Sequence, residues 1–220
     1  ADMKLALRPK SPAQLPFRAP HLTDRLLRER EEPPAEIRTG VDLRLQTTLE
    51  RAIRQYLEAR REVGLRNASA MLVDTRSMQV RALVGSADYF DASIDGQVNG
   101  TGAKRSPGST LKPFVYALAL DQGVLHPHSI LKDAPTAFGP FSPENFDGRF
   151  VGPISAQDAL VRSRNVPAVA VSAKLSRPGL YDFLRNAGVA KMASESHYGL
   201  ALTLGGGEVT MEELVRLYAA

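Results

Sequence analysis

The stretch that most constrains the fold runs from Pro107 to Gly123, because it fixes where one helix begins and how that helix must be packed. Its opening Pro-Gly pair favours a turn, and Pro113 has no backbone N–H, so it is tolerated only in the first turn of a helix. The sequence therefore predicts a helix that begins at about Ser109. Residues 114–120, FVYALAL, are apolar nearly all round, which is typical of a helix buried in the core.

Two residues at this helix start, Ser109 and Lys112, have the spacing of a nucleophile and its base. Positions i and i+3 of a helix lie on one face, one turn apart. A neutral lysine can take the proton of a serine hydroxyl, and burial lowers the pKa of a lysine because it disfavours the charged form. A helix N-terminus also favours negative charge on the serine oxygen. The two residues are therefore a candidate catalytic pair.

The spacing alone has a plainer explanation, in which Ser109 caps the helix and Lys112 lies on the surface. The chain repeats the spacing at Ser129 and Lys132, in a connection rich in His and Pro that no glycine turn precedes. We interpret this second copy as an ordinary loop. The catalytic interpretation of the first copy needs further site residues elsewhere in the chain.

Ser163 and Asn165 are the candidates for those further residues, because they lie in the predicted break between helices at 154–161 and 166–175. Alternate residues of a tight turn can point to one side. A hydroxyl and an amide there can relay a proton and hold a substrate amide. The alternative is a plain cap between two helices.

The other segments predict a mixed protein of helices and strands. An amphipathic helix is expected at 43–63 with Asp42 as its N-cap, followed by a hairpin of two apolar strands at 68–74 and 79–84. Because both faces of this hairpin are apolar, we expect it to belong to an antiparallel sheet with helices on both faces. Further helices are expected at 178–186 and 210–220.

Two segments predict irregular structure. Residues 1–40 hold six of the 15 prolines, which favours an extended connector. We therefore assign 1–40 as an inter-domain linker and 41–220 as the domain that carries the site. Residues 125–152 hold several prolines and four phenylalanines, and a connection of this length is typical of a functional loop. Its two histidines, His126 and His128, have no further ligand candidates nearby, so no metal site is predicted.

Composition excludes several classes of site. The chain has no cysteine, which excludes a disulfide, a thiolate metal site and a cysteine nucleophile. The net charge of +4 comes from 28 basic and 24 acidic residues, which are mixed along the chain, so no nucleic-acid partner is predicted. A membrane-spanning helix requires a run of about 18 apolar residues, and the sequence has no such run.

Several segments, in this order, resemble the penicillin-binding transpeptidases of the bifunctional class A group. RSPGSTLKPF at 105–114 and SRN at 163–165 resemble the first two active-site motifs of that family. FSPENFD at 141–147 resembles the loop between them, and LTLGGGEVT at 202–210 resembles the turn beyond them. Residues 15–45 resemble the linker of the class A group. The resemblance covers nearly the whole chain.

The resemblance implies a fold and a chemistry. The implied fold is α+β, a serine transpeptidase/β-lactamase-like antiparallel sheet with helices on both faces, incomplete at the C-terminus. The family's nucleophile falls on Ser109, its general base on Lys112, and the hydroxyl and amide of its second motif on Ser163 and Asn165. Ser109, Ser163 and Asn165 are therefore also expected to bind substrate. The implied reaction needs no cofactor or metal.

The resemblance also implies partners and a location. The implied substrates are peptidoglycan stem peptides that end in D-Ala-D-Ala, which the serine acyl transfer cross-links into the cell wall, and β-lactam antibiotics would acylate the same serine. Such proteins work at the periplasmic face of the bacterial inner membrane, with the full-length protein anchored in that membrane.

One departure from the family is that its third motif, Lys-Thr/Ser-Gly, is absent from the 220 residues. The family resemblance implies that this strand provides one oxyanion donor and binds the substrate carboxylate. We therefore expect the chain to be the N-terminal part of a transpeptidase domain that its own C-terminal continuation or a second chain completes, and to be inactive alone. The last predicted helix has no stop signal before Ala220, which also predicts a continuation.

Two other functions remain open at this point. A serine β-lactamase shares the Ser-x-x-Lys chemistry but must also activate a deacylating water, for which the sequence offers only Glu144 in the long loop. A non-catalytic penicillin-binding scaffold on the same fold would keep its function in the cell after Ser109→Ala. Lasting acylation by a penicillin favours a transpeptidase, and rapid turnover favours a lactamase.

Overall fold

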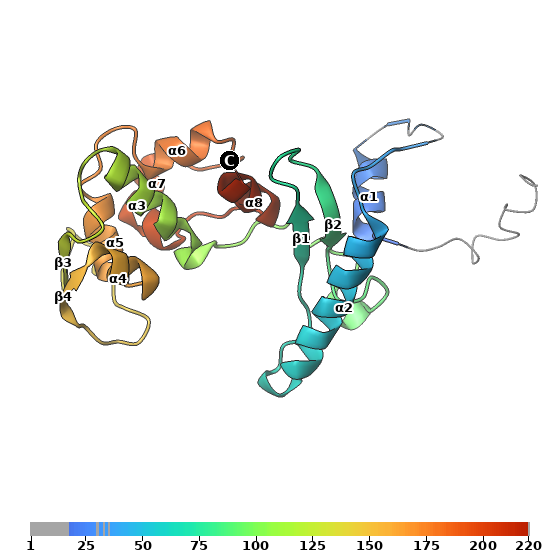
Figure 1. The fold of residues 1–220 in the computed structure, drawn as a ribbon, viewed down its shortest axis with the longest axis horizontal. Coiled ribbons are helices and arrows are strands. Elements are labelled where there is room, and N and C mark those ends of the chain that lie inside the picture. The colour runs from blue at the N-terminus through green and yellow to red at the C-terminus, as the bar shows by residue number, and fades with distance from the viewer. Residues whose placement is uncertain (1–17, 30, 33, 35, 220) are drawn as a thin grey trace, which may run out of the picture. The chain divides into compact units, whose positions relative to one another are not determined.

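The computed structural model describes residues 18–29, 31, 32, 34 and 36–219, which fold into two compact units (Figure 1). The first unit holds the described residues up to Ala103, and the second holds Lys104–Tyr218. Each unit combines a small antiparallel sheet with helices. This confirms the predicted α+β class.

The first unit is a two-stranded hairpin with two helices on the β2 side (Figure 1). β1 (Ala70–Val73) pairs with β2 (Val80–Val84), with a register shift after Leu72. The helices are α1 (Pro20–Arg28) and α2 (Leu43–Ala59). The amphipathic helix was thus predicted correctly, although its last turn, η3 (Arg61–Val63), is a separate 3₁₀ turn. A second 3₁₀ turn, η4 (Ala92–Ile94), follows the hairpin.

Backbone and side-chain polar groups fix how α2 lies on the hairpin. The carboxylate of Asp42 accepts hydrogen bonds from the N–H groups of Arg44 and Leu45 at 2.8 and 3.2 Å, as an N-cap does. One turn further on, the buried amide of Gln46 donates to Leu83 O at 3.0 Å and accepts from Leu83 N at 2.9 Å. The side chain of Gln46 therefore takes the place of a neighbouring strand at this point of β2.

The predicted linker contains ordered structure in its described part. Helix α1 packs on β2, where Leu22 and Leu83 share a small core. His21 is also buried, and its ring Nε2 lies 2.7 Å from Gly96 O. Pro9, Pro12, Pro16 and Pro33 lie outside the described residues. The linker boundary at residue 40 stays a prediction.

The second unit is built around one apolar core that joins its helices. Its first elements are η5 (Gly108–Leu111) and α3 (Lys112–Asp121), so the predicted helix begins where expected, with a 3₁₀ first turn. Leu111, Val115 and Ala119 are completely buried, whereas Leu120 is 45% exposed. One face of α3 therefore lies in the core, and the prediction that the helix is buried all round was too strong.

The other elements of the second unit follow in chain order. They are β3 (Ile130–Asp133), β4 (Gly152–Ser155), α4 (Ala156–Val161), α5 (Asn165–Ser172), α6 (Leu180–Asn186), α7 (Glu195–Tyr198), η6 (Gly199–Leu204) and α8 (Met211–Ala219).

The long connection at 125–152 is more regular than the sequence predicted. β3 lies inside it and pairs antiparallel with β4, from Ile130 opposite Ser155 to Asp133 opposite Gly152. The expected start of a helix at Ile154 was also wrong, because this residue is in β4 and α4 begins after its N-cap, Ser155. Proline in a short edge strand is compatible with pairing of this kind, which is why composition misled the prediction.

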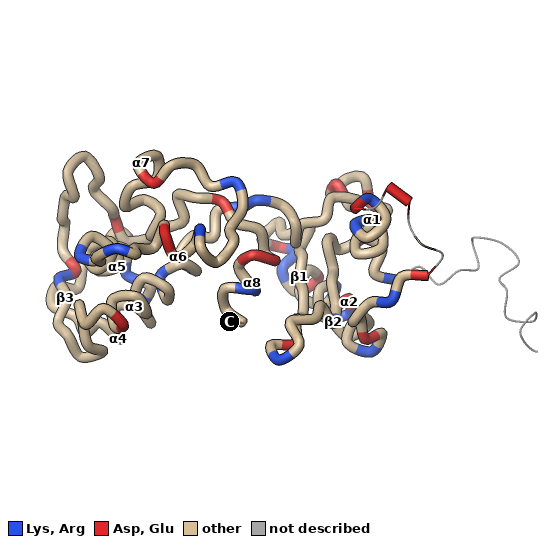
Figure 2. The backbone as a smooth tube through the Cα atoms, turned by 90° about the horizontal axis from the view of Figure 1, so that it is seen from above, with Lys and Arg blue, Asp and Glu red and all other residues tan. Residues whose placement is uncertain are grey.

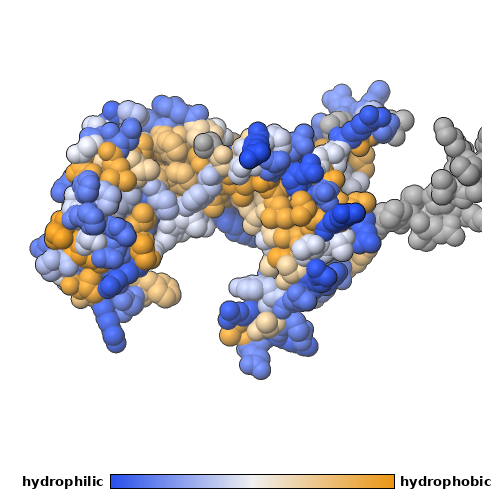
Figure 3. All heavy atoms as spheres, viewed as in Figure 1, coloured by the Kyte–Doolittle hydropathy of each residue, from blue (hydrophilic) through white to orange (hydrophobic). Residues whose placement is uncertain are grey.

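The surface carries mixed charge and scattered apolar side chains. Figure 2 shows Lys and Arg interspersed with Asp and Glu along the backbone, and Figure 3 shows hydrophobic residues among hydrophilic ones on the face in view. The large exposed apolar residues include Phe90, Phe146 and Val161. In the part of the chain that the structure describes, the helices are too short or too polar to cross a membrane.

Candidate active site

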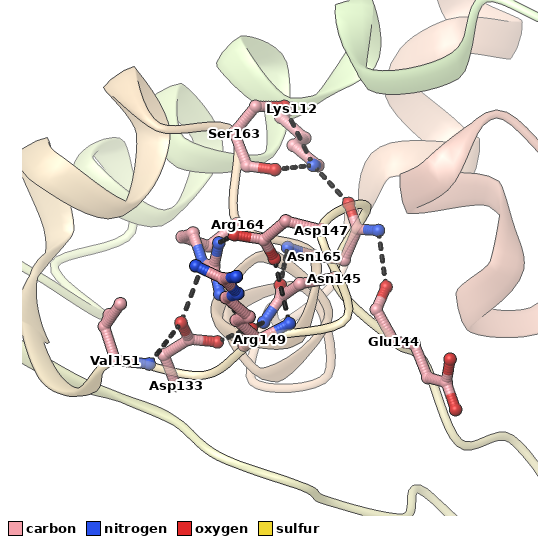
Figure 4. A network of polar contacts seen from close by, with 10 residues as sticks. All are labelled: Lys112, Asp133, Glu144, Asn145, Asp147, Arg149, Val151, Ser163, Arg164 and Asn165. Atoms are coloured by element: carbon pink, nitrogen blue, oxygen red, sulfur yellow. Dashed lines mark hydrogen bonds and ion pairs between the residues drawn. The ribbon is translucent and has the colours of Figure 1, made fainter.

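Lys112 is the centre of the candidate site, although it is a charged residue and only 1% exposed. Its Nζ donates hydrogen bonds to Ser163 O at 2.6 Å, to Asn165 Oδ1 at 2.5 Å and to Ser163 Oγ at 3.1 Å (Figure 4). The first helical residue of α3 thus reaches the turn between α4 and α5. Three of the four predicted site residues meet here.

The environment of Lys112 makes its neutral amine more available near pH 7 than that of an ordinary lysine. Burial, and to a smaller extent the positive charge of Arg164, lower the pKa of Lys112 from 10.5 to about 8. At pH 7 about a tenth of the molecules then carry a neutral amine, which can accept a proton. Lys112 is therefore desolvated, as expected for a lysine that acts as a base.

Ser109, the fourth predicted residue, lies on η5 and is exposed. The N–H of Lys112 donates to Ser109 O, and in a 3₁₀ turn the side chains at i and i+3 are eclipsed. Ser109 therefore lies directly one turn before Lys112. Within the described residues no hydrogen bond joins the Ser109 hydroxyl to Lys112, whose Nζ is occupied by the second motif, and catalytic hydrogen bonds are often long before substrate binds.

A glycine turn supports the segment that holds Ser109. Gly205 has φ +88°, and a Cβ at this position would overlap Gly108 N and lie 2.5 Å from Gly108 Cα. The hydroxyl of Ser106 donates to Gly205 O at 2.7 Å. Only a residue without a side chain allows these two backbones to approach so closely. Gly205 is thus a backbone bend that lies against the serine motif.

The turn at Ser163 ends α4 in an unusual way. The N–H of Ser163 donates to Leu160 O and that of Arg164 to Ala159 O, both at 2.9 Å, which is the Schellman pattern. Glycine is usual at the left-handed position of this motif, but Ser163 occupies it with φ 54°. Strain of this kind is concentrated at functional sites. Here it brings both the carbonyl and the hydroxyl of Ser163 to Lys112.

Asn165 is held on its other side by the long loop. Its N–H donates to Asn145 Oδ1 at 2.8 Å, and its side-chain Nδ2 donates to Glu144 O at 2.6 Å. The rotamer that presents Oδ1 to Lys112 is therefore fixed by two side-chain contacts, and the backbone is held by Asn145. Figure 4 shows the carboxylate of Glu144 directed away from Lys112 and Asn165.

An ion-pair cluster behind the turn was missed by the sequence analysis. The guanidinium of Arg164 donates to Asp133 Oδ2 at 2.7 Å, to Asp147 Oδ2 at 2.9 Å and to Arg149 O. Asp133 is fully buried and also accepts from Asn145 Nδ2 at 2.7 Å. The signal was the arginine between Ser163 and Asn165, because a charged residue in a tight buried turn requires a partner.

The arrangement has two groups that acyl transfer to a serine requires, a hydroxyl and a base. The exposed hydroxyl of Ser109 lies one turn before the buried amine of Lys112, whose pKa is lowered. The hydroxyl of Ser163 is hydrogen-bonded to that amine. Among the described residues, no three His, Asp or Glu side chains lie close enough together to bind a metal ion.

Comparisons with known proteins agree with this chemistry. The family model of the penicillin-binding protein transpeptidase domain matches residues 68–219. The chain is 39% identical over 212 residues to penicillin-binding protein 1C of Escherichia coli, which covers 96% of this chain and 27% of that protein. It is 31% identical over 166 residues to penicillin-binding protein 1A of Rickettsia bellii, covering 73% and 20%. The chain thus spans less than a third of either relative.

Solved structures show the same fold. The PonA1 protein of Mycobacterium tuberculosis in complex with penicillin V superposes with a TM-score of 0.73 at 20% identity, covering 92% of this chain and 58% of that chain. Penicillin-binding protein 1A of Haemophilus influenzae superposes with a TM-score of 0.59 at 27% identity, covering 70% and 23%. These matches confirm the resemblance drawn from the motifs. With a family model over most of its length and a relative that covers nearly all of it, the chain belongs to the penicillin-binding protein transpeptidases.

Proposed function

We propose that this chain carries the nucleophile and the general base of a peptidoglycan D,D-transpeptidase. Ser109 Oγ attacks the carbonyl carbon of the penultimate D-Ala of a stem peptide, and Lys112 Nζ takes the hydroxyl proton. The peptide C–N bond breaks, and the terminal D-Ala leaves with that proton on its amine. The acyl-serine ester is then resolved by the amine of a neighbouring stem, which forms a cross-link, or by water.

The observation that carries the proposal is the buried amine of Lys112 in contact with Ser163 and Asn165. A surface lysine beside a capping serine, which is the plain interpretation of the spacing, would have none of these contacts. Burial lowers the pKa of Lys112 to about 8, near the pH at which a general base is most effective.

Ser163 and Asn165 have supporting roles in this proposal. The hydroxyl of Ser163 lies 3.1 Å from Lys112 Nζ and can pass a proton between the lysine and the leaving amine. Asn165 orients the lysine through Oδ1, and its second role in the proposal is to bind a substrate amide. The backbone N–H of Ser109 supplies one donor to the oxyanion. The second donor comes from a Lys-Thr/Ser-Gly strand outside these 220 residues, either in the same protein or in a second chain.

The proposal also covers ligands and location. β-Lactams acylate Ser109 because their strained amide replaces the D-Ala-D-Ala peptide bond, so penicillins inhibit the enzyme. The protein works at the periplasmic face of the bacterial inner membrane, where its peptidoglycan substrate lies. The β-lactamase alternative gains no support, because the carboxylate of Glu144 is directed away from Lys112 (Figure 4).

Release of D-alanine from a D-Ala-D-Ala pentapeptide tests the proposal in the natural protein. We expect release by the wild type and none by Ser109→Ala. Ser129→Ala is the matched control, because Ser129 has the same spacing to a lysine, but its Oγ accepts a hydrogen bond from His126 N, at 2.8 Å, and among the described residues makes none to Lys132. This variant should keep full activity.

Three other results would contradict the proposal. Activity that survives in Ser109→Ala would assign the nucleophile elsewhere. Rapid, repeated hydrolysis of a penicillin would indicate a β-lactamase. A folded wild type that neither releases D-alanine nor retains a penicillin would indicate a scaffold.

A further inference from the structure

The three ionic side chains behind the Ser163 turn do not touch Lys112, yet they determine where its partners lie. The side chain of Arg164 is 8% exposed and that of Asp133 is fully buried, whereas that of Asp147 is 49% exposed. A buried charge pair contributes little net stability compared with apolar residues of the same volume. A buried arginine inside a catalytic turn therefore suggests a role beyond stability.

Asp133 connects this cluster to both sides of the site. One oxygen accepts from Arg164 Nε, and the other accepts from Asn145 Nδ2. Asn145 in turn accepts from the N–H of Asn165. The chain of contacts from Asp133 therefore leads through Arg164 to the backbone next to Ser163, and through Asn145 to Asn165. Both of these residues bind Lys112 Nζ.

We propose that Asp133, Arg164 and Asp147 form a positioning cluster for this site, in which two carboxylates hold the Ser163–Asn165 turn on Lys112 and keep the positive charge of Arg164 toward the amine. This proposal rests on the proposed function and deepens it by naming positioning residues. None of the three touches the reacting atoms. Figure 4 shows Arg164 between the carboxylate of Asp133 and the Ser163 turn.

The charge distribution supports this arrangement. Arg164 is the charged group that lowers the pKa of Lys112, while the charge of Asp133 acts instead on the buried Tyr116, whose pKa it raises together with burial. The other titratable side chains on helices packed against α3 are occupied elsewhere: Asp158 with Ser155, Asp182 with Arg177, and Arg185 and Tyr181 with each other. The carboxylate of Glu144 points away.

The test measures the rate at which a fluorescent penicillin acylates the natural protein, as a function of pH. In the wild type we expect the rate to rise with a midpoint near the pKa of Lys112, about 8. The double variant Asp133→Asn/Arg164→Gln removes the buried pair together, so that no unpaired charge is left. We expect a slower reaction and a midpoint at higher pH, because the positive charge that helps to lower the pKa of Lys112 is lost. Arg164→Lys keeps the positive charge but loses the guanidinium group that bonds both carboxylates at once. The reaction should therefore slow, with the midpoint unchanged.

Two further variants make the test decisive. Asp147→Asn leaves the buried pair intact and should fold even if the double variant does not. With one counter-charge removed from Arg164, its midpoint should move to lower pH at low ionic strength. Arg177→Gln/Glu195→Gln is the matched control, because it removes an exposed ion pair elsewhere in the same unit. Its rate and midpoint should equal those of the wild type.

An unchanged midpoint in the folded double variant, or in Asp147→Asn if the double variant does not fold, would overturn the proposal, since a purely structural cluster would change only the rate. Direct titration of Lys112 by ¹³C NMR, assigned with Lys112→Met, separates this outcome from failure of the proposed function. If the wild type is not acylated but the Lys112 titration still shifts in these variants, the positioning cluster stands and the transpeptidase proposal falls.

Discussion

At the scale of single residues, the site depends on placing an amine where water does not reach it. Lys112 is 1% exposed. In the folded protein its pKa is about 8, compared with 10.5 for an ordinary lysine. The unfolded chain therefore binds more protons than the folded chain between pH 8 and 10.5. In this window stability rises with pH, because the folded state no longer carries the buried charge.

This linkage gives a first prediction. The melting temperature of the wild type should rise from pH 8 toward pH 9.5 relative to that of Lys112→Met, which has no amine to titrate. Thermal unfolding followed by circular dichroism at several pH values measures the difference. Parallel pH profiles for the two proteins would show that Lys112 does not titrate in this range.

Gly205 gives a second prediction at this scale. Gly205→Ala adds a Cβ that overlaps Gly108, and it places a side chain at φ +88°. We expect a loss of about 1–3 kcal/mol in the free energy of unfolding and a large loss of penicillin acylation, since the Ser109 turn must move. Gly123→Ala is a suitable control, because it also has positive φ, at +65°, but no neighbouring atom within 4 Å. Equal acylation rates in the two variants would contradict the role of Gly205.

At the scale of elements, the structure shows how a short hairpin protects its edge. An unpaired strand edge is prone to pair with other chains. Gln46 of α2 instead bonds both the N–H and the C=O of Leu83 on β2. An edge that a helix side chain covers in this way is less available to another strand.

Gln46→Leu should therefore destabilise the first unit, because it leaves two buried backbone groups of Leu83 without partners. We expect a loss of about 1–3 kcal/mol, measured by urea denaturation, with little change in the rate of penicillin acylation. Thr47→Ala on the same helix, at an exposed position, should be nearly neutral. A Gln46→Leu variant as stable as Thr47→Ala would show that the pairing with Leu83 contributes nothing.

The elements also show what the sequence could and could not predict. The start of α3 and the break at Ser163 were predictable, because proline, glycine and capping residues act locally. The β3–β4 pairing was not, since it joins residues about twenty positions apart through a proline-rich loop. Asp133 and Asn145 were missed for the same reason: their partners on Arg164 and Asn165 are brought close only by the tertiary fold.

At the scale of the whole molecule, the chain carries the nucleophile and base that we propose, which are only part of a transpeptidase site. Its 220 residues contain no Lys-Thr/Ser-Gly motif. Under our proposal, acylation should therefore need a segment that bears this motif.

The most direct test of the Ser109–Lys112 assignment is mass spectrometry of the protein after incubation with a penicillin. We predict a mass increase of one penicillin in the natural protein, carried by the tryptic peptide that contains Ser109 and absent from Ser109→Ala. The 220-residue chain alone should gain none until it is joined to a segment that bears the third motif. An adduct on another residue, or one that persists in Ser109→Ala, would contradict the assignment of Ser109 as the nucleophile.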